Sequence, residues 1–403
     1  MLSVNQALEQ VSQHSYPLST HECSAFDALG AALAEDLVSP VESPAFDKAM
    51  MDGFALRSAD TCGGSANLEI VEEITAGNTA SESIQEGMAA RIMTGAPMPK
   101  GADSVVMVEH TQIDSENVDR VQILDEVPTG SHVLKRGGLL EKGQVVLSAG
   151  SIIRPIEVGI LADLAGGRVT VRRKPTVAII STGDELVEAH EEPGPGQIRN
   201  TNGPMLAAMV TEAGAEAKRL GIVRDNREHL YAAIQEGLEA DILLISGGMS
   251  VGVKDLGPGI LAEHGVEKVF HKVNLKPGKP LWFGKREGSG TPTLVFGLPG
   301  NPVSSLVCFH LFVRSALNAM MGRTAVSPFV PGFLLTRDFA NPGDRPVFFP
   351  AYACRKEGAG ATIAPLNWKG SADLATLAKA NALACFDANS QYEAGQFISA
   401  VMV

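Results

Sequence analysis

The chain has 403 residues, a formal net charge of −13 and only 5% aromatic residues. This length allows two to four domains at about 100–200 residues each. The acidic balance argues against duplex nucleic acid as a partner, because proteins that bind it gather basic side chains on one face. The few aromatic residues argue against a base-stacking surface for single strands.

The sequence also gives no sign of a disulfide framework, a zinc site or a membrane segment. Its five cysteines are scattered and form no C-x-x-C pair. The first residues lack the basic and apolar regions of a signal peptide. No apolar run approaches the roughly 18 residues that span a bilayer. These features predict a soluble, cytoplasmic protein with no membrane partner.

The first part of the chain is predicted to be helical around a β-rich insertion. Ser3 and Gln6 have the spacing of a capping box ahead of apolar positions up to Val11. The Ala- and Leu-rich stretch 24–36 is predicted to form a second helix. Between residues 38 and 140, short β-like runs (105–108 and 121–124) alternate with turns rich in Gly, Pro, Asn and Asp.

An apolar, partly helical pattern returns between residues 143 and 172, with a helix predicted at 155–164. We therefore expect this stretch to rejoin the N-terminal helices.

The clearest pattern lies between residues 176 and 317. Three runs that are apolar after their first residue predict buried strands at 176–180, 241–245 and 293–296. A further strand is predicted at 217–223, and the helices that alternate with these strands are predicted at 204–213, at 227–238 and up to residue 317. Such alternation is typical of a parallel sheet with helices on both faces.

After residue 323 the helical pattern ends. Short apolar segments at 333–336, 347–352, 361–364 and 396–403 are separated by turns. They predict a second small β domain.

The three apolar strands run into Gly-rich loops with the sequences STGDE (181–185), SGGMSVG (246–252) and GLPGNP (297–302). Ligands of open parallel sheets bind beyond the carboxyl ends of the strands, so these loops are expected to share one site. Backbone N–H groups freed by glycine, and the start of the helix at Pro302, can bind phosphate oxygens. Neither a Walker A pattern nor G-x-G-x-x-G occurs, so an ordinary nucleotide fold is unsupported.

Carboxylates beside a phosphate are repulsive unless a divalent cation bridges them. Asp184, Glu185 and Asp255 are therefore candidate ligands of Mg²⁺ or a similar ion, which takes one or two protein carboxylates and keeps waters. The alternative is that Asp184 or Glu185 only caps a helix.

Lys276 and Lys279 flank a Pro-Gly turn and form the local cluster of cations that an acidic anion-binding protein needs. The alternative is a solvated surface turn.

Seven segments together resemble the molybdopterin molybdenumtransferase family, which includes bacterial MoeA and the E domain of gephyrin. They are SP (39–40), PAFD (44–47), MDGFA (51–55), RIMTGAP (91–97), STGDEL (181–186), LKPGKP (275–280) and GLPGNPVS (297–304).

The resemblance implies an α/β plus β multidomain fold and an elongated homodimer. It implies a discontinuous N-terminal helical and dimerisation domain at 1–40 and 142–172, with an inserted β-rich domain at 41–141. A central α/β molybdopterin-binding domain at 173–324 and a C-terminal β barrel at 325–403 would follow.

The resemblance further implies transfer of molybdenum from molybdate to adenylylated molybdopterin, with release of AMP and active cofactor and with Mg²⁺ or a similar divalent cation. The implied catalytic residues are Asp52, Thr94, Glu185, Asp255, Lys276 and Lys279, and the implied metal ligands are Asp184, Glu185 and Asp255. The implied cofactor-binding residues are Ser181, Thr182, Gly183, Asn202, Gly247, Gly248, Ser250, Pro299, Asn301, Ser304, Arg345 and Ser371.

Among these residues, the resemblance assigns Lys276, Lys279, Ser304, Arg345 and Ser371 to a molybdate pocket. It brings Asp52 and Thr94 to the site across the dimer. The expected partners are small anionic substrates, a second copy of the chain, the molybdopterin adenylyltransferase and the apoproteins of molybdoenzymes.

Several positions depart from the family pattern. Leu139 stands in place of an acidic residue, Asn200 in place of an aspartate and Pro350 in place of a basic residue. These changes leave open a second hypothesis, a divergent non-catalytic paralogue that acts as a scaffold or carrier of molybdopterin. A third hypothesis, an α/β protein that binds or adenylylates molybdopterin without handling the metal, is disfavoured by the flanking β domains.

Overall fold

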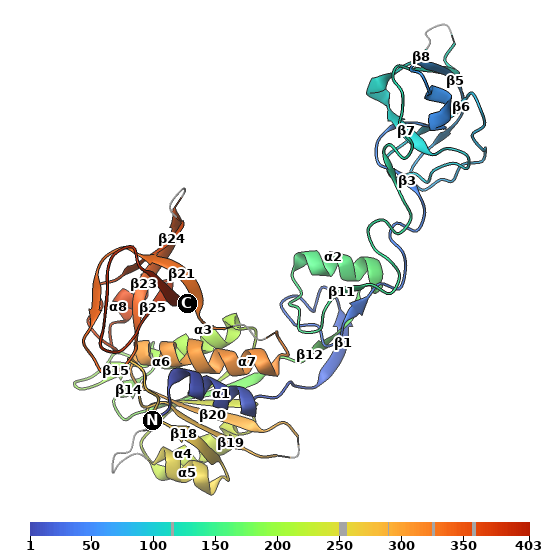
Figure 1. Cartoon of the computed structure of the whole chain (residues 1–403). Coiled ribbons are helices and arrows are strands. Elements are labelled where there is room, and N and C mark those ends of the chain that lie inside the picture. Colours follow the sequence, from blue (N-terminus) through green and yellow to red (C-terminus); the bar gives the residue numbers. More distant parts are fainter. Residues whose placement is uncertain (114–116, 250–255, 289, 325–326, 357–359) are drawn as a thin grey trace. The chain divides into compact units, whose positions relative to one another are not determined.

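A computed structural model describes residues 1–113, 117–249, 256–288, 290–324, 327–356 and 360–403. The chain forms two compact units, one of residues Asp36–Ser148 and one that joins Met1–Glu35 to Ala149–Val403 (Figure 1).

The unit at Asp36–Ser148 is built on a six-stranded sheet, which confirms its predicted β-rich character. In sheet order its strands are β7 (Ser104–Met107), β4 (Gly53–Leu56), β6 (Met88–Ile92), β5 (Ala66–Ile74), β9 (Arg120–Ile123) and β8 (Thr111–Ile113). Its short elements are β2 (Leu37–Val38), β3 (Lys48–Ala49), β10 (Val133–Leu134), β11 (Val145–Leu147), η1 (Ser58–Thr61) and η2 (Val108–His110).

Two helices were predicted in the N-terminal part of the other unit, and one of them is present. Helix α1 (Val4–His14) has the predicted capping box, with the Ser3 side chain accepting from the Gln6 N–H. The helix predicted at 24–36 is absent. Ser24, where that helix was predicted to begin, is instead the last residue of β1 (Thr20–Ser24). Turns follow it, including Gly30 at φ +81°.

Strand β1 pairs with β12 (Arg168–Arg172), and Leu33 bridges to the same strand. Pairing with a distant segment therefore overrides the local helix preference of the Ala- and Leu-rich stretch. Helix α2 (Pro155–Leu164) was predicted correctly.

A six-stranded sheet forms the centre of the α/β domain. In sheet order its strands are β16 (Glu216–Val223), β13 (Thr176–Thr182), β17 (Ile242–Ser246), β20 (Thr293–Leu298), β19 (Trp282–Arg286) and β18 (Glu267–His271). The first four are parallel, as predicted, whereas β19 and β18 continue the sheet antiparallel and were not predicted. A short parallel pair, β14 (Leu186–Val187) and β15 (Ile198–Arg199), lies outside this sheet.

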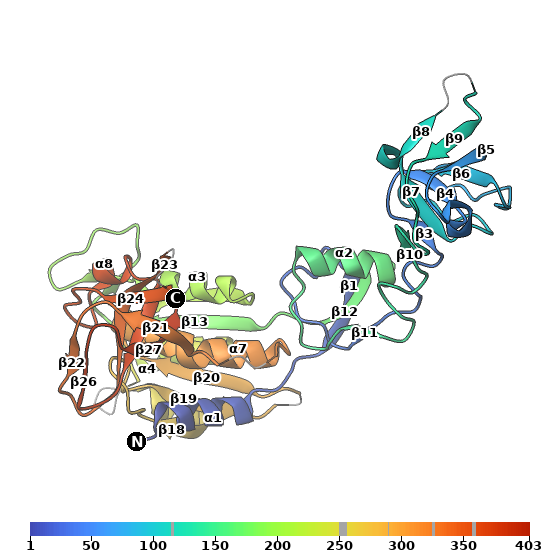
Figure 2. The ribbon, with the colours of Figure 1, turned by 45° about the horizontal axis from the view of Figure 1, so that its top comes forward.

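Helices cover both faces of this sheet. They are α3 (Asn202–Glu212), α4 (Arg227–Gly237), α5 (Gly257–Glu263), α6 (Pro302–Cys308) and α7 (Arg314–Met320), with the π-helical turn η3 (Phe309–Val313) joining the last two. One face packs against α1, α3 and the helix from α6 to α7, and the other against α4 and α5 (Figure 2).

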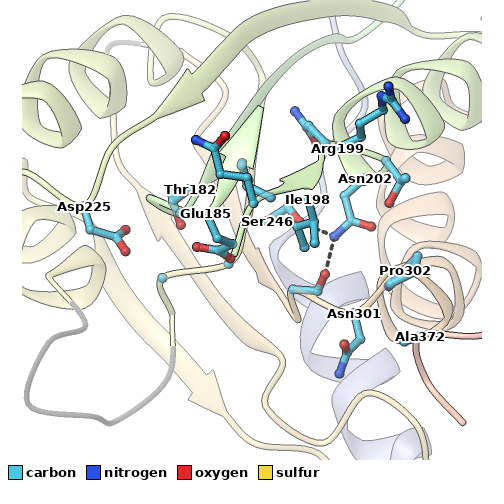
Figure 3. A pocket seen from close by; sticks show the side chains of 18 of the residues that line it. Thr182, Glu185, Ile198, Arg199, Asn202, Asp225, Ser246, Asn301, Pro302 and Ala372 are labelled. Atoms are coloured by element: carbon cyan, nitrogen blue, oxygen red, sulfur yellow. Dashed lines mark hydrogen bonds between the residues drawn. The ribbon is translucent and has the colours of Figure 1, made fainter. Parts of the chain in front are cut away.

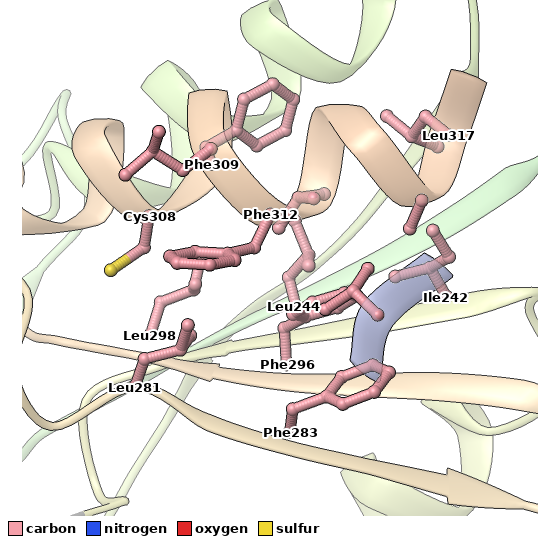
Figure 4. Packing of buried hydrophobic residues seen from close by; sticks show 14 of the residues in the cluster. Ile242, Leu244, Leu281, Phe283, Phe296, Leu298, Cys308, Phe309, Phe312 and Leu317 are labelled. Atoms are coloured by element: carbon pink, nitrogen blue, oxygen red, sulfur yellow. The ribbon is translucent and has the colours of Figure 1, made fainter. Parts of the chain in front are cut away.

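Alternate residues of the central strands serve the two layers. Leu244 and Phe296 contact the first layer, where Phe309 and Phe312 lie over the sheet (Figure 4). Leu243 and Val295 face the second layer.

The helix Pro302–Met320 is apolar and long enough to cross a membrane, but 72% of its most apolar window is buried within the structure. It is a core helix of the α/β domain.

The C-terminal segment closes a barrel of five strands, which confirms the second β domain. In barrel order they are β21 (Val330–Leu335), β24 (Gly360–Pro365), β23 (Val347–Lys356), β25 (Ala382–Phe386) and β27 (Phe397–Met402). The short elements β22 (Phe339–Asn341), β26 (Ser390–Tyr392) and α8 (Leu374–Leu377) complete the domain. Strand β25 was not predicted.

His310, in the π-helical turn, predicts a loss of stability in mild acid. Burial and the neighbouring Arg314 lower the pKa of His310 from 6.5 to about 4, so the folded chain keeps this imidazole neutral. The unfolded chain takes up a proton as the pH falls below about 6.5, so stability is lost as the pH falls towards 4. By pH 5 this loss should reach about 2 kcal/mol.

Urea unfolding at pH 7 and pH 5 tests this expectation. The His310→Gln variant should lose less stability between the two pH values than the unchanged chain, whatever its stability at pH 7. Equal losses would show that His310 does not cause the effect.

Candidate active site

A cavity of about 610 Å³ lies at the carboxyl ends of β13 and β17 (Figure 3). We call it the sheet-edge cavity. The residues that line it are Thr182, Gly183, Glu185, Leu186, Pro193, Gln197, Ile198, Arg199, Asn200, Thr201, Asn202, Asp225, Leu230, Ser246, Gly247, Gly248, Leu256, Gly300, Asn301, Pro302 and Ala372. All three predicted Gly-rich loops contribute to it, which confirms that they meet at one edge.

Asn202, at the start of α3, links the Gly-rich loop after β17 to the Gly-rich loop after β20. Its Nδ2 donates to the Ser246 Oγ and to the Gly300 carbonyl, both at 2.7 Å. Asn200 braces the same turn, because its Oδ1 accepts from the Gly203 N–H at 3.0 Å and from the Ser181 hydroxyl at 3.2 Å.

Three buried polar atoms beside this cavity have no hydrogen-bond partner among the described residues, namely Thr182 Oγ1, Asn200 Nδ2 and Asn202 Oδ1. Unpartnered buried polar atoms are costly, so their gathering here fits a site completed by a polar ligand or water.

Gly247 and Gly248 allow two loops to approach closely. Both have positive φ, at +92° and +61°. A Cβ on Gly247 would lie 2.7 Å from the Thr182 carbonyl oxygen, and a Cβ on Gly248 would lie 2.6 Å from Thr182 Oγ1. Only glycine fits at either position, as the predicted close approach of the backbone requires.

The acidic residues of the first loop differ in their surroundings. The Glu185 side chain lines the cavity and folds back over Gly183, where a Cβ would lie 2.6 Å from its Oε2. Asp184 accepts a hydrogen bond from the Asp225 N–H at 3.1 Å, so it braces a neighbouring loop rather than capping a helix.

Asp255 and Ser250 lie outside the described residues. Within the described ranges, no group of three or more His, Cys, Asp or Glu side chains could hold a metal ion. The predicted metal site therefore stays a prediction.

Helix α6 begins at the same edge. Asn301 lines the sheet-edge cavity, and its side chain makes no capping hydrogen bond. Pro299 is not among the lining residues, and its carbonyl accepts from the Ser305 hydroxyl at 2.5 Å, which fixes the start of the helix.

A second cavity, of about 590 Å³, lies between the α/β domain and the barrel. We call it the lysine cavity. Its lining residues are Lys276, Pro277, Gly278, Lys279, Pro280, Ser304, Arg345, Phe349, Trp368, Lys369, Gly370 and Ser371. The structure thus brings together all five residues predicted for an oxyanion pocket, although they come from four separate parts of the chain.

Three hydrogen bonds join the lysine turn to residues 345–348. The Lys276 N–H donates to the Pro346 carbonyl at 2.9 Å, and the Phe348 N–H donates back to the Lys276 carbonyl at 2.8 Å. Arg345 Nη1 donates to the Leu275 carbonyl at 3.2 Å. The lysine turn is therefore tied to the first residues of β23.

The lysine cavity carries three lysines and one arginine, and no acidic residue is among its described lining residues. Asp344 lies 3.6 Å from Arg345, but its side chain is 90% exposed and screened by water. In a chain of net charge −13, this concentration of positive charge fits a compact, multiply charged oxyanion.

Asp52 and Thr94 form a close pair within the unit Asp36–Ser148. The Asp52 Oδ1 accepts from the backbone N–H and from the hydroxyl of Thr94, both at 2.6 Å. The Thr94 hydroxyl, followed by its N–H, lowers the pKa of Asp52. Both residues are exposed, so this ionised pair is available to a ligand.

The positions that depart from the family pattern are accommodated in the fold. Asn200 is buried and forms the hydrogen bonds described above. Pro350 lies in β23 opposite Leu383, and its carbonyl accepts from the Leu366 N–H at 2.9 Å. Leu139 is 60% exposed.

Sequence reasoning missed several lining residues. Asp225 and Arg199 line the sheet-edge cavity, and Trp368 and Lys369 line the lysine cavity. Lys369 stands two residues before Ser371 in a glycine-containing turn, which was an available signal. Asp225 follows strand β16, and the same sheet-edge argument could have selected it.

Three family models match the chain. The MoeA N-terminal region (domains I and II) matches residues 2–165, the probable molybdopterin binding domain 178–319 and the MoeA C-terminal region (domain IV) 333–402.

Full-length relatives and a solved structure agree with these matches. The chain is 33% identical to a molybdopterin molybdenumtransferase of Staphylococcus epidermidis, over 100% of the chain and 95% of that protein. It is also 33% identical to the Bacillus subtilis molybdopterin molybdenumtransferase, over 100% of the chain and 94% of that protein. The crystal structure of a molybdopterin biosynthesis moeA protein from Pyrococcus horikoshii OT3 has a TM-score of 0.85 and 31% identity over the whole of both chains.

The glycine geometry predicts the effect of adding a methyl group in the loop after β17. Gly247→Ala should destabilise the chain by about 1–2 kcal/mol, because it forces a left-handed backbone on alanine and a contact with the Thr182 carbonyl. Gly259→Ala is the matched control, since it lies in α5 with open space around it. Thermal unfolding should separate the two variants, and equal midpoints would contradict the close approach.

Proposed function

This chain belongs to the MoeA family of molybdopterin molybdenumtransferases, which act in molybdenum cofactor biosynthesis, and we propose that its two cavities divide the two substrates between them. The sheet-edge cavity would bind adenylylated molybdopterin, and the lysine cavity would bind molybdate. Transfer of molybdenum to the pterin would release AMP and active cofactor. The observation that carries this proposal is the lysine cavity, with four cations and no acidic residue among its described lining residues.

The sheet-edge cavity suits the larger substrate. Gly183, Gly247 and Gly248 line this cavity with positive φ and no side chain, so the loop backbone can lie close to phosphate oxygens. The start of α6 at Asn301 and Pro302 adds the positive end of a helix. Thr182, Asn200 and Asn202 would form polar contacts with the rest of the molecule.

The lysine cavity suits the tetrahedral dianion. Lys276 and Lys279 would act as point charges, while Ser304 and Ser371 would donate hydroxyl hydrogen bonds. The transfer brings two anions together, so their mutual repulsion is a main part of the barrier. Fixed cations that are already in place lower that barrier without reorganisation.

The carboxylates fit a divalent cation such as Mg²⁺. Glu185 offers oxygen ligands inside the sheet-edge cavity, and Asp184 lies next to it in the chain. Mg²⁺ needs only one or two such groups beside water and phosphate oxygens. Asp184, Glu185 and Asp255 would hold the ion, which when bound would neutralise the negative charge of the pyrophosphate link.

We further propose a homodimer in which Asp52 and Thr94 of one chain complete the site of the other. Their hydrogen-bonded pair is preformed and exposed. The adenylyltransferase that supplies the substrate and the apoproteins that receive the product would be transient partners in the cytoplasm.

A non-catalytic carrier is the second candidate. The departures at Leu139, Asn200 and Pro350 favour it, because each removes a charged group from the family pattern. Glu185 in the sheet-edge cavity and Lys276 and Lys279 in the lysine cavity count against it.

Release of AMP in a reconstituted mixture of the chain, molybdate, Mg²⁺ and adenylylated molybdopterin tests the proposal. AMP release should require molybdate. Lys276→Gln should lower the rate at limiting molybdate by about 100-fold, as expected when a positioned electrostatic group is lost. Glu185→Gln should raise the Mg²⁺ concentration needed for half-maximal rate.

Lys379→Gln removes an exposed lysine outside both cavities and is the control. Tight binding of the adenylylated pterin without AMP release by the unchanged chain would support the carrier instead.

Mixed dimers test the shared site. Asp52→Asn and Lys276→Gln chains are unfolded together and refolded, so that about half of the dimers contain one chain of each kind. If Asp52 acts across the dimer, each mixed dimer holds one intact site, and the mixture should recover about a quarter of the full activity. A site contained in one chain would leave both sites of the mixed dimer damaged and give no recovery.

A further inference from the structure

We propose that Lys369 sets the charge selectivity of the lysine cavity, so that it favours tetrahedral dianions over tetrahedral monoanions of the same size. This inference rests on the proposed role of that cavity in binding molybdate. It adds a residue that the predicted oxyanion pocket did not contain.

Lys369 lies on a turn whose backbone is fixed. Its N–H donates to the Asp373 Oδ2 at 3.0 Å, and the Asp373 N–H donates to the Gly370 carbonyl at 2.9 Å. Gly370 has φ +129°, a conformation that few residues other than glycine adopt. The turn therefore holds Lys369 at the cavity wall before any ligand arrives.

The same turn is tied to the rest of the pocket. The Ser371 carbonyl accepts from the Val303 N–H at 3.1 Å, next to Ser304 in the first turn of α6. Lys369 and Ser371 line one cavity together with Lys276 and Lys279. A ligand held by the predicted residues would thus come within reach of the Lys369 ammonium group.

The attraction between the Lys369 ammonium and Asp373 is the smallest of the causes that lower the pKa of that carboxyl, so it offsets little of the lysine charge. Both oxygens of Asp373 accept backbone N–H groups, Oδ2 from Lys369 and Oδ1 from Thr376 at 3.0 Å. Asp373 does not line the lysine cavity, and the described residues show no ion pair to the Lys369 ammonium. The exposed Lys369 side chain can therefore turn its charge towards an anion in the cavity.

By Coulomb's law, an extra cation in the cavity favours a doubly charged anion over a singly charged one. The attraction between a fixed cation and an anion doubles when the anion carries two charges instead of one. A lysine added to the pocket consequently strengthens binding of molybdate more than binding of perrhenate, a tetrahedral oxyanion with a single charge. A hydroxyl or backbone donor distinguishes them less.

Equilibrium dialysis of the full-length chain with molybdate and with perrhenate tests the proposal. Lys369→Gln should weaken molybdate binding about tenfold, the scale of one lost charge-assisted hydrogen bond, and perrhenate binding about threefold. Lys369→Arg should retain most of the selectivity. Lys379→Gln, which removes an exposed lysine from the same domain, should change neither affinity.

A parallel titration of Lys276→Gln distinguishes a failure of the Lys369 proposal from a failure of the proposal that the lysine cavity binds molybdate. If Lys276→Gln weakens molybdate binding and Lys369→Gln does not, Lys369 has no role and the cavity assignment stands. If neither variant changes molybdate binding, the lysine cavity is not the molybdate site and both proposals fail. Equal weakening of both anions in Lys369→Gln would show that Lys369 supports the turn rather than selecting charge.

Discussion

Burial of the apolar strands β13, β17 and β20 between two layers of helices is the constraint on which both cavities depend. The apolar side chains on both faces of these strands are buried only if helices cover the sheet on both sides. Because the strands are parallel, the loops that follow them all lie at one edge. The sheet-edge cavity follows directly from this arrangement. The lysine cavity depends on it indirectly. Helix α6 begins at the same edge, and its residue Ser304 lines the lysine cavity together with the lysine turn and the barrel.

Electrostatics then distinguishes the two cavities. The sheet-edge cavity mixes backbone donors, buried amides and carboxylates, which suits a large ligand with a bridging cation. The lysine cavity gathers cations and hydroxyls and, among its described lining residues, has no acidic group. An acidic chain would repel both substrates at long range, so these local cations must supply the attraction at close quarters.

Much of this could be predicted from the sequence, since fully apolar strands and their glycine loops are local signals. The antiparallel strands β18 and β19 could not, because each has only two consecutive large apolar residues beside charged ones. The helix predicted at 24–36 is absent although its residues favour a helix, because Ser24 and Leu33 pair with β12 instead. Local helix propensity alone therefore does not predict the structure of this stretch. Lys369 was missed for another reason. A single lysine in a turn gains meaning only when the fold places it beside Lys276 and Lys279.

The division of the substrates between the two cavities is tested most directly by locating the metal. Crystals grown with molybdate can be measured on both sides of the molybdenum absorption edge, and the anomalous difference then marks the metal alone. We expect a peak in the lysine cavity, within hydrogen-bonding reach of Lys276, Ser304 and Ser371. A peak in the sheet-edge cavity beside Thr182 and Ser246, with none between the lysines, would contradict it.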